Sequence, residues 1–399
     1  MTPLAIFDIV VLAALAALFA QMLMNLRAIP RLSAFRSRVP NDPAASRSVS
    51  SIVPPRVSVL IPARNEAVRI IACVAAWREQ RYASYEVLIY DDQSTDDTAA
   101  RARQAARGAA HVRVIGGSPL PDGWRGKTHA CHRLRESACG SVLVFSDADV
   151  VPEPTALACT MDALAALAAD ALSALPSHAS DHVMLGALAS IQNWAALTLI
   201  PLWLPWARCR PAFAAMNGQF IAISAAVYDA SGGFAAVANS LAEDTALGRR
   251  LVGLGYRVRL ADGAGLLTCC AYTRLADLWR ANVRNMTAVL FGSPWALLGS
   301  AFGLATVYVA PFALLVIALA FGRAGSTAWT LLPAIACALA IGARALVERR
   351  SGHAAWTALL HPFTMAALVA IQLDAGCRTR ARGSVEWRGR RYPISADVA

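Results

Sequence analysis

Charged side chains are scarce in this chain, and lysines are very few among them. Asp, Glu, Lys and Arg together make up 16% of the 399 residues, against about 25% in an average soluble domain. Hydrophobic residues make up 57%, and the mean hydropathy is +0.46. This composition argues against a chain that is soluble throughout, so part of it is expected to lie in a lipid bilayer.

The cysteine pattern lacks the spacings of metal sites and disulfide frameworks. The nine cysteines include no CxxC pair and no Cys/His metal spacing, and Cys269 and Cys270 are direct neighbours, which suits a disulfide poorly. We therefore expect reduced thiols that pack as small apolar side chains.

Motifs of the usual nucleic-acid-binding kinds are also missing, despite a net charge of +11 and a pI near 9.6. The basic residues instead lie beside apolar segments, where they suit the anionic headgroups at the cytoplasmic face of a membrane. We therefore predict membrane lipids, and no nucleic acid, as partners. The residues concerned are Arg27, Arg31, Arg36 and Arg38 at one end, and Arg378, Arg380, Arg382, Arg388, Arg390 and Arg391 at the other.

The apolar runs predict a membrane-anchored, multi-pass chain. Residues 3–26 are long enough to span a bilayer, and residues 1–27 are interpreted as an uncleaved anchor with its N-terminus outside. A cleaved signal peptide is the alternative, but it needs a basic start, and this chain begins MTPLAIFD. Residues 28–55 form a basic linker rich in Pro and Ser.

The last third of the chain is again typical of membrane helices. Candidate spans are 300–322, 328–347 and 354–373, within a region of transmembrane or interfacial helices at 287–375. Residues 376–399 form a basic tail, which positive-inside counting places in the cytoplasm. Three spans would put it outside, so one of these segments, or 286–298, is expected to be re-entrant or interfacial.

A further apolar stretch, 185–206, lies within the region that we interpret as catalytic. If it spanned the membrane, the carboxylates before and after it would lie on opposite sides. Its tryptophans and the following Arg208 and Arg210 favour a helix that rests in the interface and docks a lipid substrate.

Between the apolar ends, residues 56–286 show the alternation of an α/β domain. Residues 57–61, 86–90, 112–115 and 141–145 are predicted strands, with helices at 66–80 and 98–106. The β-α-β-α-β order predicts a doubly wound, mostly parallel sheet flanked by transmembrane helices. Ligands bind such sheets at the carboxyl ends of the strands.

Polar residues follow the first two predicted strands. The first strand is expected to break at Pro62 and to lead into Arg64, Asn65 and Glu66, although this segment also suits an ordinary helix N-terminus. The second ends at Asp91 and Asp92. Helix capping accounts for the later Asp96 and Asp97, but not for two carboxylates at a strand tip, where a carboxylate can accept from a nucleobase imide.

Another carboxylate pair follows the strand SVLVF. Asp147 and Asp149 alternate along what we expect to be extended chain, so both side chains can face one cation. Hard oxygen ligands with few protein contributors favour Mg²⁺ or Mn²⁺, with phosphate oxygens completing the shell. A DxD pair alone is weak evidence, but its place at the end of a strand strengthens it.

Two acidic residues open a later predicted helix. Glu243 and Asp244 suit the helix dipole, and this explanation has weight for Glu243. Asp244 is the natural candidate for a general base.

The ordered series IPARNEA, YDDQSTDDT, SDAD, GQF, GG and ED resembles the family-2 inverting glycosyltransferases, which share the GT-A fold. WRGKTHAC and VEWRGRRYP look like the membrane-bound subgroup that glycosylates carotenoid or other polyprenoid lipids, with hopanoid-associated and ceramide glycosyltransferases as more distant relatives. The resemblance implies a nucleotide-sugar site at Pro62, Arg64, Glu66, Asp92, Lys127 and Asp147, a metal on Asp149, catalytic Asp244 and Glu243, and an acceptor side at Gly218, Gln219 and Phe220.

Individual roles follow from the same resemblance. Asp92 would contact the uracil of a UDP-sugar, Asp147 the ribose or sugar, and Lys127 the diphosphate. A solvated loop lysine is the plain alternative for Lys127, but the scarcity of lysine favours a specific use.

The sequence departs from the family pattern in one place. Processive relatives carry QxxRW, and the subgroup carries a Trp followed by a Lys-Asn pair, whereas this chain has LWRANVRNM. Trp279 is expected on the acceptor side. Arg284 would serve the diphosphate in place of the lysine, or anchor to lipid headgroups.

The sequence thus predicts a metal-dependent inverting glycosyltransferase of a bacterial-type inner membrane, with a cytoplasmic catalytic domain. The expected donor is a nucleotide-sugar, a UDP-hexose, and the acceptor is a hydroxyl or carboxyl of a lipid. A processive polysaccharide synthase, disfavoured by the missing QxxRW, and a non-catalytic membrane scaffold are the alternatives.

Overall fold

The computed structural model of the protein describes residues 2–38, 54–180, 182–204, 210–214, 216–270, 272–290, 292–321, 327–382, 384–387 and 390–393. They form two compact units. The sheet unit comprises Ala28–Ala179 and Leu202–Ala271, and the helical unit comprises Met1–Arg27, Ser180–Pro201 and Tyr272–Ala399. Most of the predicted linker, Trp206 and Arg208 lie outside the described residues.

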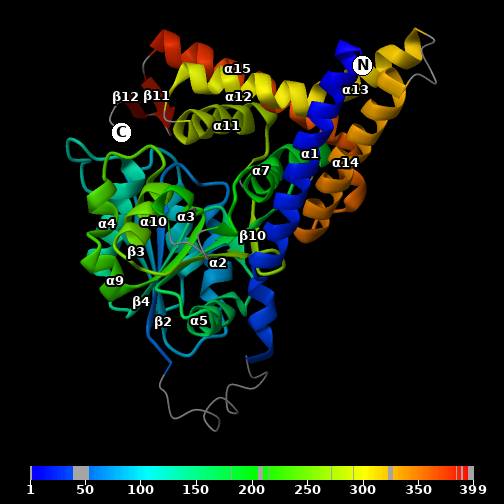
Figure 1. Ribbon diagram of the computed structural model, residues 1–399. Coiled ribbons are helices and arrows are strands. Elements are labelled where there is room, and N and C mark those ends of the chain that lie inside the picture. Colours follow the sequence, from blue (N-terminus) through cyan, green and yellow to red (C-terminus); the bar gives the residue numbers. More distant parts are fainter. Residues whose placement is uncertain are drawn as a thin grey trace. The chain divides into compact units, whose positions relative to one another are not determined.

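The sheet unit is built on a seven-stranded sheet with the order β3-β2-β1-β4-β8-β6-β9 (Figure 1). Neighbouring strands are parallel except at β8, which runs antiparallel to β4 and β6. The predicted doubly wound α/β sheet is confirmed. Its strands are β1 (Val57–Ala63), β2 (Tyr85–Asp91), β3 (Val112–Gly116), β4 (Val142–Ser146), β6 (Ala171–Leu175), β8 (Phe220–Ser224) and β9 (Val258–Asp262), and a small second sheet holds β5 (Val150–Pro152), β7 (Ser177–His178) and β10 (Leu267–Cys269).

Helices cover both faces of the sheet because its strands are apolar on both sides. Val59 and Ile61 face one core and Leu60 the other, as the alternation of strand side chains requires. The first core holds side chains of α2 (Ile70–Arg78), α3 (Thr98–Ala106) and α5 (Ala156–Ala166). The second holds those of α4 (Gly126–Ser137), α9 (Ala225–Ala230) and α10 (Glu243–Gly253); the short helices are η1 (Leu32–Arg38), η3 (Pro211–Phe213) and η4 (Gly233–Val237).

Strand β1 does not break at Pro62, which corrects the sequence-based expectation. It continues beside β2 to Ala63, which lies opposite Asp91. Pairing with β4 has already stopped at Leu60. The missing N–H of Pro62 therefore falls where one ladder has ended, which makes a proline tolerable in a central strand.

The helical unit contains α1 and most of the chain after residue 271. Its elements are α1 (Pro3–Ala28), α6 (Val183–Ala189), α7 (Ile191–Leu199), α11 (Leu275–Val289), α12 (Pro294–Leu304), η5 (Ala305–Val309), α13 (Ala310–Ala320), η6 (Thr327–Leu331), α14 (Leu332–Arg350), η7 (Ala355–Leu360), α15 (His361–Arg382), β11 (Ser384–Trp387) and β12 (Arg390–Pro393).

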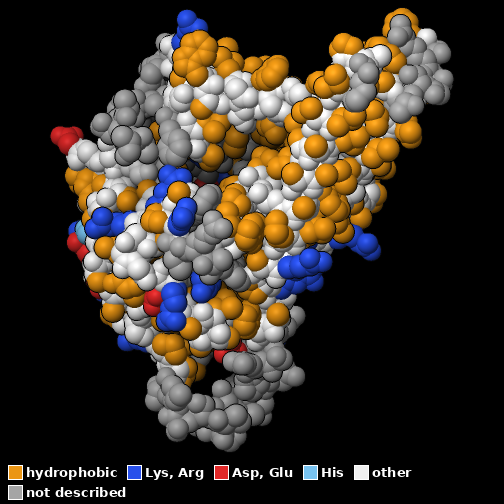
Figure 2. Space-filling model, viewed as in Figure 1, with side chains coloured by type: hydrophobic (Ala, Val, Ile, Leu, Met, Phe, Trp, Pro, Cys, Tyr) orange, Lys and Arg blue, Asp and Glu red, His pale blue; other side chains and the backbone are white. Residues whose placement is uncertain are grey.

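Among the described residues, four helical stretches are long and apolar enough to cross a membrane. They are Pro3–Ala28, Pro294–Ala320, Ala328–Arg350 and Ala355–Arg380, which confirms the predicted flanking membrane helices. Hydrophobic side chains gather over α13 and α14 on the face drawn in Figure 2. The stretch Val183–Leu199 is apolar but shorter, and it is divided into α6 and α7.

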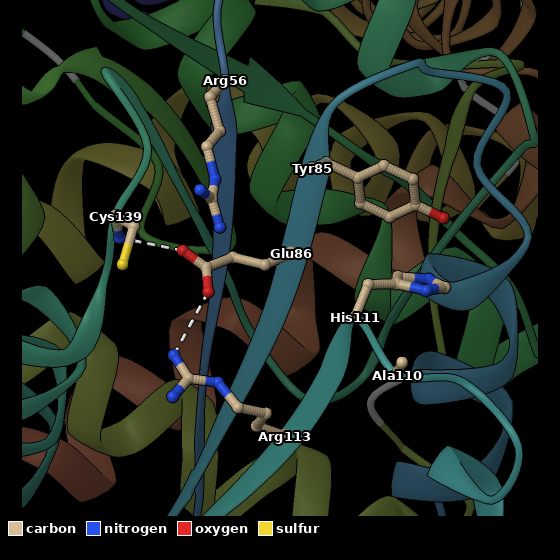
Figure 3. A pocket seen from close by; sticks show the side chains of 7 residues that line it. All are labelled: Arg56, Tyr85, Glu86, Ala110, His111, Arg113 and Cys139. Atoms are coloured by element: carbon tan, nitrogen blue, oxygen red, sulfur yellow. Dashed lines mark hydrogen bonds and ion pairs between the residues drawn. The ribbon is translucent and has the colours of Figure 1, made fainter.

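A cavity of about 320 Å³ lies at the amino-terminal ends of the central strands (Figure 3). Glu86 at the start of β2 fills part of it, accepting from Ser58 Oγ at 2.7 Å, the backbone N–H of Cys139 at 2.8 Å and Arg113 Nη2 at 3.2 Å. These contacts tie the starts of neighbouring strands together. Since ligands of doubly wound sheets bind at the opposite, carboxyl ends, we do not take this cavity for the functional site.

Candidate functional site

The loops after β1 and β2 form one hydrogen-bonded unit at the carboxyl edge of the sheet. Arg64 Nη1 donates to the carbonyl oxygens of Asp92 at 2.5 Å and Gln93 at 2.9 Å, and the N–H of Asp92 donates to Ala63 O at 2.8 Å. Arg64 therefore fixes the backbone on which Asp92 sits. Asp92 itself is buried.

Glu66 belongs to the same pair of loops. Its backbone N–H donates to Thr98 Oγ1 at 2.7 Å, and its carboxylate accepts from Arg69 Nη1 at 3.0 Å. Thr98 begins α3, so the bond from the Glu66 N–H is a second link between the loop after β1 and the loop after β2. The predicted residues Arg64, Glu66 and Asp92 thus lie in one local framework.

The DxD segment is a turn between β4 and β5, and not extended chain. The N–H of Val150 donates to Asp147 O at 3.2 Å and closes that turn. The predicted alternation along a strand is therefore wrong. The two carboxylates nevertheless lie close enough to interact: the negative charge of Asp149 is one of the causes that raise the pKa of Asp147.

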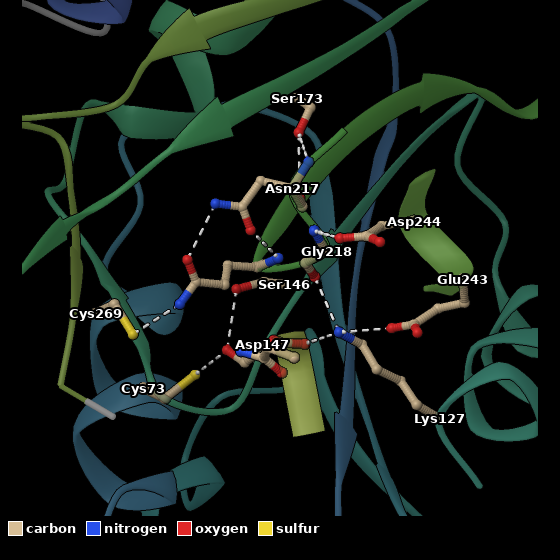
Figure 4. Close-up of polar contacts among 12 residues, drawn as sticks. Cys73, Lys127, Ser146, Asp147, Ser173, Asn217, Gly218, Glu243, Asp244 and Cys269 are labelled. Atoms are coloured by element: carbon tan, nitrogen blue, oxygen red, sulfur yellow. Dashed lines mark hydrogen bonds and ion pairs between the residues drawn. The ribbon is translucent and has the colours of Figure 1, made fainter. Parts of the chain in front are cut away.

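Lys127 joins three separate segments of the site (Figure 4). Its ammonium lies 2.7 Å from Asp147 Oδ1 and 3.3 Å from Glu243 Oε1, and it donates to Gly218 O at 3.2 Å. Lys127 is the second residue of α4 and the sequence's only lysine, so it is not the solvated loop lysine of the plain alternative.

Asp244 lies on the other side of the same glycine. Its Oδ2 accepts from the N–H of Gly218 at 2.7 Å, and its Oδ1 accepts from the N–H of Thr245 at 2.7 Å. The acidic residues in the first turn of α10 thus divide their contacts. Glu243 pairs with Lys127, whereas Asp244 bonds to backbone N–H groups.

Burial is the largest single influence on each pKa in this cluster, but it decides the direction only for the two aspartates. It raises the pKa of Asp147 to about 6, although the adjacent Lys127 acts in the opposite direction. Burial, and next the charge of Glu243, raise the pKa of Asp244 to about 6 against Lys127 and the two backbone N–H groups. Burial lowers the pKa of Lys127, but Asp147 and Glu243 outweigh it, so this pKa is raised.

The donor set fits a divalent cation that is shared with a phosphate ligand. Asp147 and Asp149 supply carboxylate oxygens, which Mg²⁺ and Mn²⁺ prefer. No cluster of three or more His, Cys, Asp or Glu suited to a metal occurs in the described part of the chain. Such a cation would therefore need oxygens from its ligand, as the sequence also predicts.

The loop before β8 is organised by a residue that the site prediction did not include. The N–H of Asn217 donates to Ser173 Oγ at 2.7 Å, and its side chain bonds both the N–H of Gln219, at 3.0 Å, and Gln219 Oε1, at 3.1 Å. Gln219 Nε2 lies 3.0 Å from Cys269 Sγ. Asn217 directly precedes the GQF motif, and this position next to the motif could have marked it as a site residue in the sequence.

Phe220 does not line the site, which corrects its predicted place on the acceptor side. It is the first residue of β8, its side chain is fully buried, and its ring stacks on Trp77 with centroids 6.3 Å apart. It packs in the core on the α2 side of the sheet.

Trp279 and Arg284 lie on α11, in the helical unit. Trp279 Nε1 donates to Asp374 Oδ2 at 2.8 Å, and Arg284 Nη2 donates to Asn285 Oδ1 at 3.3 Å. These contacts stay within that unit. An acceptor role for Trp279 and a diphosphate or headgroup role for Arg284 therefore remain predictions.

We expect Gly218→Ala to disturb the site while leaving the fold intact. A Cβ at residue 218 would lie 3.0 Å from Lys127 Nζ and 3.1 Å from Asp244 Oδ2, so both side chains would have to move. Because small misplacements of reacting groups are costly, activity should fall by roughly 10- to 100-fold, measured as nucleotide release with the thermal midpoint as a fold check. Gly116→Ala, whose Cβ would meet no atom within 4 Å, is the control; equal activity of the two variants would contradict this geometry.

Comparison with known proteins agrees with this architecture. The sequence model of glycosyltransferase-like family 2 matches residues 54–288. A curated relative, the 4,4'-diaponeurosporenoate glycosyltransferase of Staphylococcus aureus, is 39% identical over 95 residues, which are 24% of this chain and 24% of that protein. The match thus spans about a quarter of the relative's length.

A solved structure resembles the chain over nearly its whole length. The mannosyltransferase PcManGT of Pyrobaculum calidifontis, in complex with GDP-Man and Mn²⁺, aligns with 94% of this chain and 99% of its own, at a TM-score of 0.52 and 18% identity. At this identity the similarity establishes the fold alone.

Proposed function

The chain belongs to glycosyltransferase-like family 2, and we propose that it transfers a hexose from a nucleoside diphosphate sugar, with inversion, to a hydroxyl or carboxyl group of a lipid. The observation that carries this proposal is that an ammonium group and a carboxylate both contact the backbone of Gly218. Lys127 contacts the carbonyl of Gly218, and Asp244 contacts its N–H. A leaving diphosphate and an attacking hydroxyl would need these two groups close together.

The reaction is a single displacement. The acceptor oxygen attacks the anomeric carbon, and Asp244 takes the proton from that oxygen as the new glycosidic bond forms. The bond between the anomeric carbon and the diphosphate breaks on the opposite face, and the electron pair leaves with the nucleoside diphosphate. The raised pKa of Asp244, about 6, leaves this carboxylate ionised at neutral pH yet more basic than an exposed aspartate.

The other residues bind and orient the donor. Lys127 would stabilise the negative charge that develops on the leaving diphosphate, with Asp147 holding its ammonium in place. Asp92 would accept a hydrogen bond from the nucleobase, the uracil of a UDP-sugar. A Mg²⁺ or Mn²⁺ ion held by Asp149 would neutralise phosphate charge when bound.

The lipid acceptor is supported by the membrane context and by the curated relative. In the described part of the chain, four helical stretches have the length and composition of membrane spans, so the enzyme would meet lipids where it is anchored. The name of the curated relative describes the glycosylation of a diaponeurosporenoate. We propose a bacterial-type inner membrane with the sheet unit in the cytoplasm, where nucleotide-sugars are made.

A direct test is incubation of membranes that contain the protein with labelled UDP-glucose, UDP-galactose or GDP-mannose, followed by mass analysis of the extracted lipids. We expect one UDP-hexose to label a lipid by a single hexose unit, and EDTA to reduce labelling at least 10-fold until Mn²⁺ or Mg²⁺ is restored. Membranes with Asp149→Asn should stay inactive after metal addition.

The same assay separates the alternatives. A ladder of hexose units would instead support a processive synthase. Absence of labelling with all three donors, together with no nucleotide release, would contradict the proposal. Labelling that persists fully in EDTA would contradict the metal assignment alone.

A further inference from the structure

Helix α14 of the helical unit carries an almost completely buried ion pair. Arg344 and Glu348 are each 1% exposed, and Arg344 Nε lies 2.5 Å from Glu348 Oε1. Arg344 Nη2 donates to Ala187 O at 2.7 Å and to Ser190 Oγ at 2.6 Å. These contacts join α14 to Ala187 of α6 and to Ser190 between α6 and α7, and α7 lies beside α14 (Figure 1). Arg344 Nη1 is buried without a hydrogen bond among the described residues.

More unused hydrogen-bonding atoms follow along α7. Trp194 lies one helical turn after Ser190 and donates its backbone N–H to Ser190 O at 3.1 Å, and Thr198 lies one turn further along the same helix. The ring of His361, at the start of α15, lies against Trp194. Both ring nitrogens of His361, Trp194 Nε1 and Thr198 Oγ1 are buried and have no hydrogen-bond partner in the described part of the chain. His361, Trp194 and Thr198 are each at most 1% exposed. Such a concentration of unmet hydrogen bonds is unusual in a folded protein and calls for an occupant.

Three aromatic rings pack against one another at the same place. The ring centroids of Trp194 and His361 are 5.4 Å apart, those of Tyr308 and His361 5.5 Å, and those of Trp194 and Tyr308 5.0 Å. Tyr308 belongs to η5, a π-helical segment between α12 and α13. Short π-helical segments within α-helices occur frequently at functional sites.

The chemistry of these atoms defines what they would bind. An arginine Nη and a tryptophan Nε1 only donate hydrogen bonds, whereas Thr198 and His361 can donate or accept. The occupant must therefore offer an acceptor oxygen. Because the surrounding helices include three of the four candidate membrane spans, an amphiphile whose polar end carries that oxygen is the fitting class.

We propose that Arg344, His361, Trp194 and Thr198 form a binding site for the carboxylate or hydroxyl oxygen of a lipid. Arg344 Nη1 and Trp194 Nε1 donate to the lipid oxygen, and the aromatic rings contact the adjoining carbons. The proposal concerns binding, and it holds whether or not the bound lipid receives the sugar.

The test uses the full-length protein in detergent with oleic acid, oleyl alcohol and 1-octadecene, which share a chain length and differ in the polar end. Oleic acid or oleyl alcohol should raise the thermal midpoint, and 1-octadecene should not. Trp194→Phe and Thr198→Val should weaken lipid binding, so that the half-saturating lipid concentration rises by about 2- to 10-fold, the effect of one lost hydrogen bond. Thr287→Val is the control, because this buried hydroxyl bonds within its own helix, to Val283 O at 2.9 Å.

Stability without lipid makes the test independent of misfolding. Replacing an unpaired buried hydroxyl by a methyl group of the same shape is neutral or stabilising, so Thr198→Val should keep or raise the lipid-free midpoint, whereas Trp194→Phe also removes buried volume. Equal effects of all three probes, or a lipid response unchanged in both variants, would overturn the proposal and leave water as the occupant.

A transfer assay identifies the source of the lipid. A raised acceptor KM with unchanged kcat in Trp194→Phe would make the bound lipid the sugar acceptor, whereas unchanged kinetics would make it a resident membrane lipid. Loss of sugar transfer in the wild type would refute the proposed function without affecting the binding result.

Discussion

Asp244→Asn is expected to abolish sugar transfer while nucleotide binding persists. A positioned general base contributes about 10²- to 10⁴-fold to rate, and the amide cannot take the acceptor's proton. We therefore expect kcat to fall by that factor, with the Kd for UDP, measured by calorimetry, changed less than about threefold. Asp229→Asn is the matched control, because this exposed carboxylate pairs with Arg135 away from the cluster.

The pH profile supplies a second readout for the same residue. Since the raised pKa of Asp244 is about 6, the ionised form prevails above this pH, so wild-type kcat should rise towards pH 6 and then level off. Asp244→Asn should lose this dependence. An aspartate whose folded pKa exceeds its unfolded pKa costs stability above that pKa, so the asparagine variant should be no less stable at neutral pH. Full turnover in Asp244→Asn would refute the base assignment.

Lys127→Met should have the next largest effect. Removing the ammonium deletes a charge that would face the leaving diphosphate, which typically costs about 10²- to 10³-fold in kcat. It also leaves Asp147 and Glu243 without their shared cation. Lys127→Arg should recover only part of the activity, because a planar guanidinium does not replace a compact ammonium.

Because the sequence contains a single lysine, Lys127 can be observed by NMR after labelling. Reductive methylation with ¹³C-formaldehyde labels amines, and Lys127 is the sequence's only lysine. Its dimethylamine signal should shift when UDP and Mn²⁺ are added. Arg133→Met, on the same helix and paired with the nearby Glu136, should leave kcat unchanged. A Lys127→Met enzyme within threefold of wild-type kcat/KM would contradict the role.

The fold was predictable from local patterns. Strands β1, β2 and β4 are buried on both faces and consist mainly of apolar residues, whereas the edge strand β3 is only partly buried. The membrane helices follow from length and hydropathy alone. The segment of Asp147 and Asp149 was misjudged because a DxD pattern fits a turn as well as a strand. Phe220 was misjudged because the motif does not reveal where the loop ends and the buried strand β8 begins.

The central contacts of the site could not be derived from spacing. Lys127, Asp147, Gly218 and Glu243 come from four separate segments, and only the folded sheet brings them to one edge. The sequence indicated Lys127 through its rarity, but not its two carboxylate partners. Likewise, nothing local in α14 predicts that Arg344 bonds Ser190, which lies far away in the chain.

The division of the chain has a practical consequence for obtaining the sheet unit alone. The chain passes between the two units four times, since Ser180–Pro201 belongs to the helical unit although the residues on either side of it belong to the sheet unit. Trimming the ends would therefore keep α6 and α7 and strip them of Arg344 and Glu348. To obtain a water-soluble fragment, Ser180–Pro201 must also be replaced by a short polar loop, because this segment is an insertion in the sheet unit.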